Sequence, residues 1–132
     1  MFRKKFKKAR PTEPVYYPDG VMVETETDTY YIQRGKRYRT FSPRTRDSWS
    51  LKPILGSNAS VSHIPLVKSP LGFRDGTLIH NFADGKIYLI SGTKRRLIAS
   101  PDVFERYGWT NQDIVTVSLE EVDLHEKGEN LS

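Results

Sequence analysis

Residues 75–109 read DGTLIHNFADGKIYLISGTKRRLIASPDVFERYGW, and this stretch decides the fold. Three short strands are predicted in it, at Thr77–His80, Ile87–Ile90 and Lys94–Ala99, because each is rich in β-forming side chains and is bounded by turn residues. Asp84-Gly85 predicts a type I′ hairpin turn between the first two strands, since both residues tolerate a positive φ. The segment therefore predicts that the folded unit begins with three antiparallel strands.

A helix is predicted directly after the third strand. Ser100-Pro101-Asp102 combines an N-cap serine, a proline at the first helical position and an acid in the first turn. Val103, Phe104 and Tyr107 fall on one side of this helix, and Gly108 can end it. Asp113–Val117 then predicts a fourth strand, and Ser118–Glu121 is a capping box that opens a last short helix.

The chain repeats itself with a period of about 56 residues, so that residues 19–72 match residues 75–128. Asp19-Gly20 matches Asp75-Gly76. The other matches are Tyr31 with Tyr88, Gly35-Lys36-Arg37 with Gly92-Thr93-Lys94-Arg95, Ser42-Pro43 with Ser100-Pro101, Val61-Ser62 with Val117-Ser118, and Gly72 with Gly128. Insertions fall in predicted turns, as expected for a duplicated folded unit.

The first copy follows the plan more loosely. Its predicted strands are Val21–Glu24, Tyr30–Gln33 and Lys36–Phe41. The helix start at Ser42-Pro43 leads into polar residues, and Pro65 falls where the second copy has Glu121, so a full last helix is not expected there.

We therefore expect an α+β, strand-rich fold of two tandem β-β-β-α-β(-α) repeats. One repeat is marginal for an independent core, so the two are expected to pack pseudo-symmetrically. The predicted divisions are a basic N-terminal arm at 1–14, repeat 1 at 15–72, repeat 2 at 73–128 and a C-terminal tail at 129–132.

Basic charge is concentrated at the start of the chain. The protein has 21 Lys and Arg against 16 Asp and Glu, and the first ten residues contain six of the basic groups. Such an arm is typical of contact with an anionic partner, although a solvated tail is the alternative. Phe2 and Phe6, four residues apart, could also anchor a short amphipathic helix on a membrane or in a groove.

Motifs for catalysis, metal binding or cofactor binding are missing from the sequence. There is no Cys, and the three histidines, at 63, 80 and 125, lack metal-ligand spacing. No Gly-rich phosphate loop, nucleophile elbow or paired-carboxylate motif is present, so a non-enzymatic protein without cofactors is expected. No apolar run approaches the ~20 residues of a membrane span, and no Sec signal peptide is recognised.

Cations and aromatics interleave on the predicted strands of the first copy. A β-surface of this kind can neutralise phosphates and stack bases, or its Lys and Arg stems can simply lie over aromatic rings. Because Lys36-Arg37 recurs as Lys94-Arg95, that pair indicates a role in the fold. The predicted binding residues, for nucleic acid or an acidic partner, are Arg3, Lys4, Lys5, Lys7, Lys8, Arg10, Arg34, Arg37, Arg39, Arg44 and Arg46.

The second copy resembles a tandem repeat module of bacterial cell-envelope and bacteriophage virion proteins. The shared pattern is DG-x-L-I, a Y-L-I strand, G-x-K-R, S-P-x-V-F and V-x-V-S, and it covers residues 75–128 better than 19–72. The resemblance implies a non-catalytic module that docks on other virion or envelope proteins. Assembly in the host cytoplasm into a phage particle is the leading expectation. The alternatives are a nucleic-acid-binding protein and a wall-glycan binder that stacks sugars on Tyr30, Tyr31, Tyr38 and Trp49.

Overall fold

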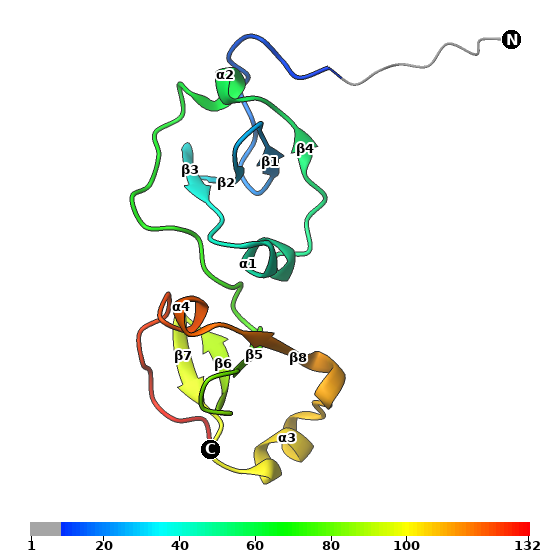
Figure 1. Cartoon of the computed structure of the whole chain (residues 1–132), viewed down its shortest axis with the longest axis vertical. Helices are drawn as coiled ribbons and strands as arrows, with labels where there is room; N and C mark the ends of the chain where they lie inside the picture. The colour runs from blue at the N-terminus through cyan, green and yellow to red at the C-terminus, as the bar shows by residue number, and fades with distance from the viewer. Residues whose placement is uncertain (1–8) are drawn as a thin grey trace, which may run out of the picture. The chain divides into compact units, whose positions relative to one another are not determined.

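The computed structural model describes residues 9–132, and in this part of the chain it shows two four-stranded mixed sheets and four short α-helices (Figure 1). Contacts divide the described chain into two compact units. The first unit contains the residues up to Thr40 together with Leu51–Ser69. The second contains Phe41–Ser50 and Pro70–Ser132. The two sheets and four short helices make the described chain α+β with strands predominant, as the sequence predicts.

The sheet of the first unit has the order β3-β2-β1-β4. Its strands are β1 (Met22–Glu24), β2 (Thr29–Gln33), β3 (Lys36–Arg39) and β4 (Ile54–Leu55). The first three are antiparallel neighbours, whereas β4 runs parallel to β1. Helix α2 (Asn58–Val61) follows β4, and its Val61 packs with Val23, Tyr30, Ile32 and Ile64 in the core of this unit.

The sheet of the second unit has the equivalent order, β7-β6-β5-β8. The strands are β5 (Leu78–Asn81), β6 (Ile87–Ser91), β7 (Lys94–Leu97) and β8 (Ile114–Val117), and β8 is again the parallel strand. Helix α3 (Pro101–Tyr107) and a 3₁₀ turn (Asn111–Asp113) connect β7 to β8, and α4 (Leu119–Val122) follows. This order confirms the predicted β-β-β-α-β-α plan.

Hydrophobic side chains cover both faces of the second sheet. One face, with Ile79, Tyr88 and Ile90, packs against Val122 of α4 and Phe73. The other face, with Leu78, packs with Val103 of α3, Ile98 and Leu131. This division follows from the strand period of two, which sends neighbouring residues to opposite faces.

The structural equivalences differ from the sequence matches in four places. Gly128 is equivalent to Val67 rather than Gly72, because its N–H donates to the Arg95 carbonyl as the Val67 N–H donates to that of Arg37. Tyr88 is equivalent to Tyr30 rather than Tyr31, because Tyr30 pairs with Val23 as Tyr88 pairs with Ile79. Thr93, not Gly92, takes the position of Gly35, since each donates its N–H to the first aspartate of its repeat. Val122, not Val117, takes the position of Val61 at the end of the last helix. The offset between repeats thus grows from 56 to 58 to 61 residues along the chain.

The last helix of the first copy does form, contrary to expectation. The Ser57 side chain accepts the Ser60 N–H, and the Ser60 hydroxyl accepts the Ser57 N–H, so two serines replace the Ser118–Glu121 capping box. Pro65 is equivalent to Glu126 and lies beyond this helix, where it breaks nothing: the Arg37 N–H donates to its carbonyl as the Arg95 N–H does to that of Glu126.

Helix α1 (Pro43–Ser48) belongs to repeat 1 by sequence, but its contacts place it in the second unit. The Ser42 hydroxyl accepts the Thr45 N–H at the start of the helix, and the hydroxyl of the buried Thr45 accepts the Ser42 N–H. The predicted boundary at residues 72 and 73 describes the duplicated pattern, whereas the contacts group residues 41–50 with the second sheet.

The hairpin between β5 and β6 is longer than the predicted type I′ turn. The Asn81 N–H donates to the Lys86 carbonyl, so four residues separate the paired positions. Gly85 has a φ of +75°, whereas Asp84 is not among the residues with positive φ. A type I′ turn requires positive φ at both central residues, which here occurs at Gly92-Thr93 (+58° and +64°).

Candidate docking groove

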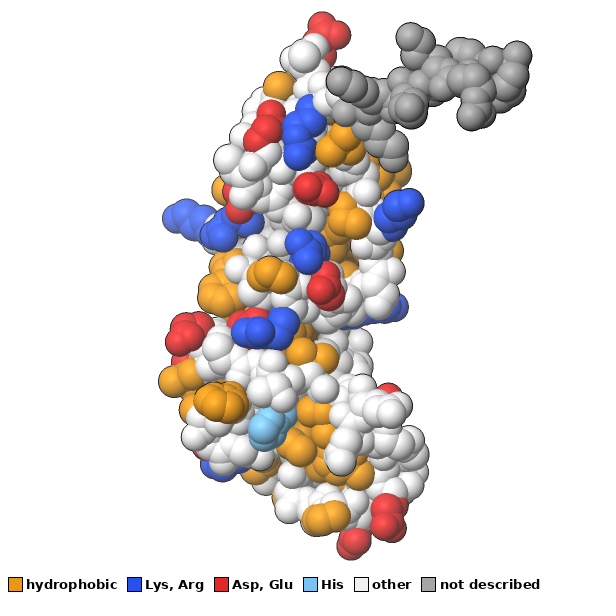
Figure 2. All heavy atoms as spheres, turned by 45° about the vertical axis from the view of Figure 1, so that its right-hand side comes forward, with side chains coloured by type: hydrophobic (Ala, Val, Ile, Leu, Met, Phe, Trp, Pro, Cys, Tyr) orange, Lys and Arg blue, Asp and Glu red, His pale blue; other side chains and the backbone are white. Residues whose placement is uncertain are grey.

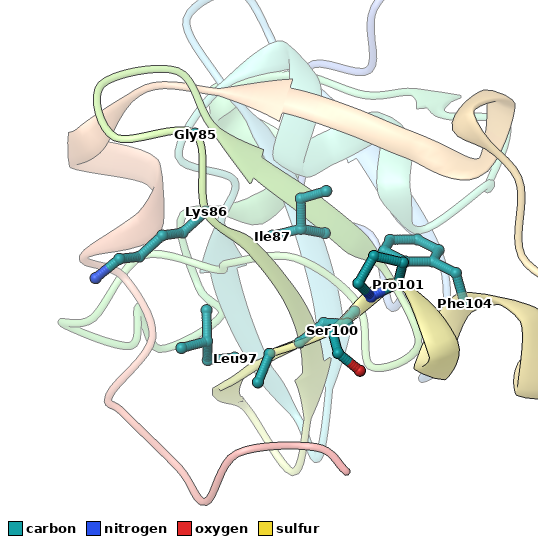
Figure 3. A pocket seen from close by; sticks show the side chains of 9 residues that line it. Gly85, Lys86, Ile87, Leu97, Ser100, Pro101 and Phe104 are labelled. Atoms are coloured by element: carbon teal, nitrogen blue, oxygen red, sulfur yellow. The ribbon is translucent and has the colours of Figure 1, made fainter.

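A hollow of about 430 Å³ lies in the second unit between the start of β6, the end of β7 and α3 (Figure 3). We call it the α3 groove. It is lined by Gly85, Lys86, Ile87, Leu97, Ile98, Ala99, Ser100, Pro101 and Phe104. Most of these side chains are apolar, and the volume falls in the range of ~300–1,000 Å³ that binding pockets occupy.

The local sequence explains why the groove forms. Strand β7 ends at Leu97, and the Ile98 N–H still donates to the Ile87 carbonyl, which holds the exit of β7 against β6. Pro101 fixes the first helical φ of α3. Within this helix Val103 is buried in the core, and the half-buried Phe104 packs against the same cluster while it also lines the groove.

Aromatic rings extend the apolar surface beyond the groove. Phe104 packs edge-to-face on Trp109 with ring centroids 5.7 Å apart, and Tyr107 stacks on Trp109 at 4.7 Å. Tyr107 is 50% exposed, and Phe82 on the β5–β6 loop is 79% exposed. Figure 2 shows hydrophobic side chains gathered on one face of the second unit, in the lower half of the view.

Carboxylates adjoin the groove in sequence. Asp84 precedes the lining residue Gly85, Asp102 follows Pro101, and Glu105 follows Phe104. Asp102 and Glu105 are exposed, and neither forms an ion pair with another residue of the range 9–132. The Lys86 side chain extends away from Pro101 and Phe104 (Figure 3). Helix α3 thus carries two carboxylates without an ion pair to any described residue, at positions adjacent in sequence to the groove lining, together with the basic Arg106.

The buried Glu121 belongs to the fold. Its carboxylate accepts hydrogen bonds from the Ser118 N–H at 2.9 Å, from the Ser42 hydroxyl and from Arg44 Nε at 3.0 Å. Burial alone would raise the pKa of this carboxyl, but these hydrogen bonds and the Arg44 charge outweigh it and lower the pKa below its ordinary value. Glu121 thus ties α1 to α4 inside the second unit.

His125 is also a structural residue. Its Nε2 accepts the Phe73 N–H at 3.0 Å, and its Nδ1 lies 2.7 Å from the Thr93 carbonyl, so Nδ1 carries the proton. Burial is the main cause that lowers the His125 pKa, and the ring is neutral at pH 7. Gly72 leaves room for it, because a Cβ there would lie 2.5 Å from Nε2.

Arg37 and Arg95 perform the same structural task in the two repeats. Arg37 lies 4.8 Å above the Tyr30 ring and donates from Nε to the Ile64 carbonyl at 2.8 Å. Arg95 lies 5.7 Å from the Tyr88 ring centroid and donates to the equivalent carbonyl, that of His125, at 2.6 Å. Both guanidinium groups therefore bind the chain that leaves the last helix of their repeat.

The predicted binding residues are divided between the two units and the part of the chain that the structure does not describe. Arg3, Lys4, Lys5, Lys7 and Lys8 lie outside the described residues. Arg10 donates to the Glu24 and Gly56 carbonyls, so it is held by the first unit.

The remaining candidates are distributed over both units. Arg44 is bound to Glu121, and Arg46 pairs with Asp47 at 3.0 Å. Arg34 occupies the β2–β3 turn with φ +56°, and Arg39 follows Arg37 on the same face of β3. Neither Arg34 nor Arg39 forms an ion pair with a residue in the described range.

The four aromatics considered for glycan stacking are divided between the two faces of the first sheet and the second unit. Tyr30 is 6% exposed in the core of the first unit, and its strand neighbour Tyr31 points to the opposite face, where it pairs with Tyr38. Trp49 belongs to the second unit and donates its indole N–H to the Gly72 carbonyl.

Within residues 9–132, no group of three or more His, Asp or Glu side chains is arranged to hold a metal ion. Across the same residues, every helix is too short or too polar to cross a bilayer.

The groove residues Ile87, Leu97, Pro101 and Phe104 were not among the predicted binding residues. Of these, only Phe104 had a signal in the sequence, as an apolar side chain on the same side of its helix as Val103.

Comparisons with known proteins place few limits on function. No family model matches the chain, and no curated protein matches it. One similar solved structure is titled "Structure of the periplasmic assembly from the ESX-5 inner membrane complex, C1 model". It is 11% identical with a TM-score of 0.34, and the match covers 92% of this chain and 42% of that one.

Proposed function

We propose that this protein is a non-enzymatic docking subunit of a larger protein assembly, and specifically a small structural component of a bacteriophage particle assembled in the host cytoplasm. Its second unit presents the α3 groove to protein partners, and its basic N-terminal segment contacts an acidic surface. The repeat pattern of residues 75–128, which resembles virion and envelope modules, supports the phage assignment.

The observation that carries this proposal is the apolar, aromatic-flanked α3 groove beside exposed Tyr107 and Phe82. Exposed apolar surface of this kind is typical of protein interaction sites. The buried titratable groups Glu121 and His125 are, by contrast, occupied by hydrogen bonds that hold α1, α4 and the segment before β5. Their perturbed pKa values therefore have a structural explanation.

The nucleic-acid alternative is weaker, because most of the described candidate cations are occupied. Arg10, Arg37 and Arg44 bind carbonyls or a carboxylate of the protein itself. Sequence-independent binding to phosphates would depend steeply on salt concentration.

Fractionation of purified particles tests the proposal. Quantitative mass spectrometry across a density gradient is expected to find the chain at a constant ratio to the major particle protein. Absence from the particles would contradict the proposal. Recovery of the chain only with free nucleic acid, released by moderate salt, would favour the alternative instead.

A further inference from the structure

We propose that the α3 groove receives the N-terminal segment of a second copy of this chain, residues 1–8. Phe2 or Phe6 occupies the apolar floor, and the Lys and Arg side chains between them pair with the carboxylates of Asp102 and Glu105. The inference rests on the proposed function and names one partner for the docking surface.

The shape and chemistry of the groove suit one aromatic side chain. Ile87, Leu97, Pro101 and Phe104 supply apolar walls around a hollow of about 430 Å³. The Phe104 ring offers an aromatic partner, and aromatic pairs are more favourable than their buried area alone predicts. Residues 1–8, MFRKKFKK, contain two phenylalanines and no acid.

Charge favours the same occupant. Residues 1–8 carry five cations, whereas the groove is bordered in sequence by Asp84, Asp102 and Glu105. Lys86 and Arg106 offset part of this acidity, and the sum of the five groups is still negative. A cationic segment with apolar anchors therefore complements the α3 groove better than an acidic or a purely apolar one.

The described chain begins at a fixed point from which the segment extends. Arg10 Nη1 donates to the Gly56 carbonyl at 2.9 Å and to the Glu24 carbonyl at 3.1 Å. The Ser57 hydroxyl donates to the Pro11 carbonyl. The residues before this anchor can span at most ~30 Å. Docking into another copy makes a heterologous contact, and contacts of this kind link subunits head to tail into rings or filaments.

Sedimentation velocity of the full chain over a wide concentration range tests the inference. The wild-type protein is expected to associate as concentration rises. The double variant Phe2→Ala/Phe6→Ala and the double variant Asp102→Asn/Glu105→Gln are each expected to weaken the association at least tenfold. The second variant keeps side-chain size at exposed positions, so it folds normally.

Two matched controls remove the same chemistry elsewhere in the second unit. Leu119→Ala deletes an exposed apolar side chain of α4 outside the groove, and Glu126→Gln/Glu129→Gln neutralises two exposed carboxylates. Both are expected to associate as the wild type does. Equal weakening by these controls would overturn the inference, because it would show a general loss of apolar area or charge.

A synthetic peptide of residues 1–8 provides a second readout. Added to the Phe2→Ala/Phe6→Ala chain, it is expected to shift the NMR signal of the Trp109 indole, which packs on Phe104. A concentration-independent wild-type mass overturns the inference. If the wild-type chain does not associate but its Trp109 indole signal differs from that of the Phe2→Ala/Phe6→Ala variant, the segment docks in its own copy.

Failure here is distinguishable from failure of the proposed function. Particles that contain the Phe2→Ala/Phe6→Ala chain at the wild-type ratio, together with a wild-type chain that does not self-associate, would refute only this inference. Absence of the wild-type chain from particles would refute the proposed function.

Discussion

Replacing Glu121 by glutamine tests how a buried carboxylate holds α1 on the second unit. The substitution keeps the size of the side chain but removes the charge that accepts from Ser118, Ser42 and Arg44. Hydrogen bonds to charged groups contribute about 1.5–3 kcal/mol each. The side chain of Arg44 is 53% exposed, so solvent screening reduces its part. We expect Glu121→Gln to lower the free energy of unfolding by about 2 kcal/mol.

Urea unfolding monitored by tryptophan fluorescence measures this loss, because Trp49 and Trp109 both lie in the second unit. Glu120→Gln is the matched control, since Glu120 is an exposed neighbour in the same helix. It is expected to change the free energy of unfolding by less than ~0.5 kcal/mol. Equal stability of the two variants would refute the reasoning.

The pH dependence of stability gives the same test a second form. The folded pKa of Glu121 is lowered, so its contribution is complete above the unfolded value of about 4.3 and is lost as the pH falls through the folded pKa. The loss of unfolding free energy at acid pH should therefore be smaller in Glu121→Gln than in Glu120→Gln. Parallel pH profiles for the two variants would argue against a stabilised carboxylate.

Three further predictions concern the other structural contacts. Because the pKa of His125 is lowered in the folded protein, its contribution to the free energy of unfolding is complete above pH ~6.5 and is lost as the pH falls through the folded pKa. His125→Gln should therefore flatten the dependence of stability on pH in that range. An unchanged slope would contradict a buried neutral ring. Gly72→Ala should cost about 2 kcal/mol in urea unfolding, because its Cβ displaces His125 from the Phe73 N–H, and wild-type stability would show that the ring moves freely. Arg37→Lys should cost about 1 kcal/mol by far-UV circular dichroism, since lysine lacks the planar fork that both covers Tyr30 and donates to the Ile64 carbonyl; no loss would reassign Arg37 to the surface.

Local signals predicted the order of elements correctly. The Ser-Pro starts of α1 and α3, the αL Gly108 and the Ser118–Glu121 box all act within a few residues, so their chemistry can be read from the sequence. The register between repeats could not be read in this way. Loops of different length shift it, and the match of Val61-Ser62 to Val117-Ser118 was a coincidence of residue types.

Hydrogen-bond partners that are distant in the chain could not be predicted from the sequence. Glu121 binds Ser42 and Arg44 across 79 and 77 residues, and no periodicity announces such contacts. For Arg37 the sequence indicated part of the answer. Its recurrence as Arg95 indicated a role in the fold, but only the structure shows which carbonyl each guanidinium binds.

Site-specific crosslinking inside purified particles tests the docking role most directly. A photoreactive residue at Ala99, an exposed position that lines the α3 groove, is compared with the same residue at Lys52, an exposed position in the first unit. The account predicts crosslinks from position 99 to a structural protein of the particle or to residues 1–8 of another copy. Particles in which position 99 crosslinks to nothing, while position 52 reacts with neighbouring subunits, would contradict it.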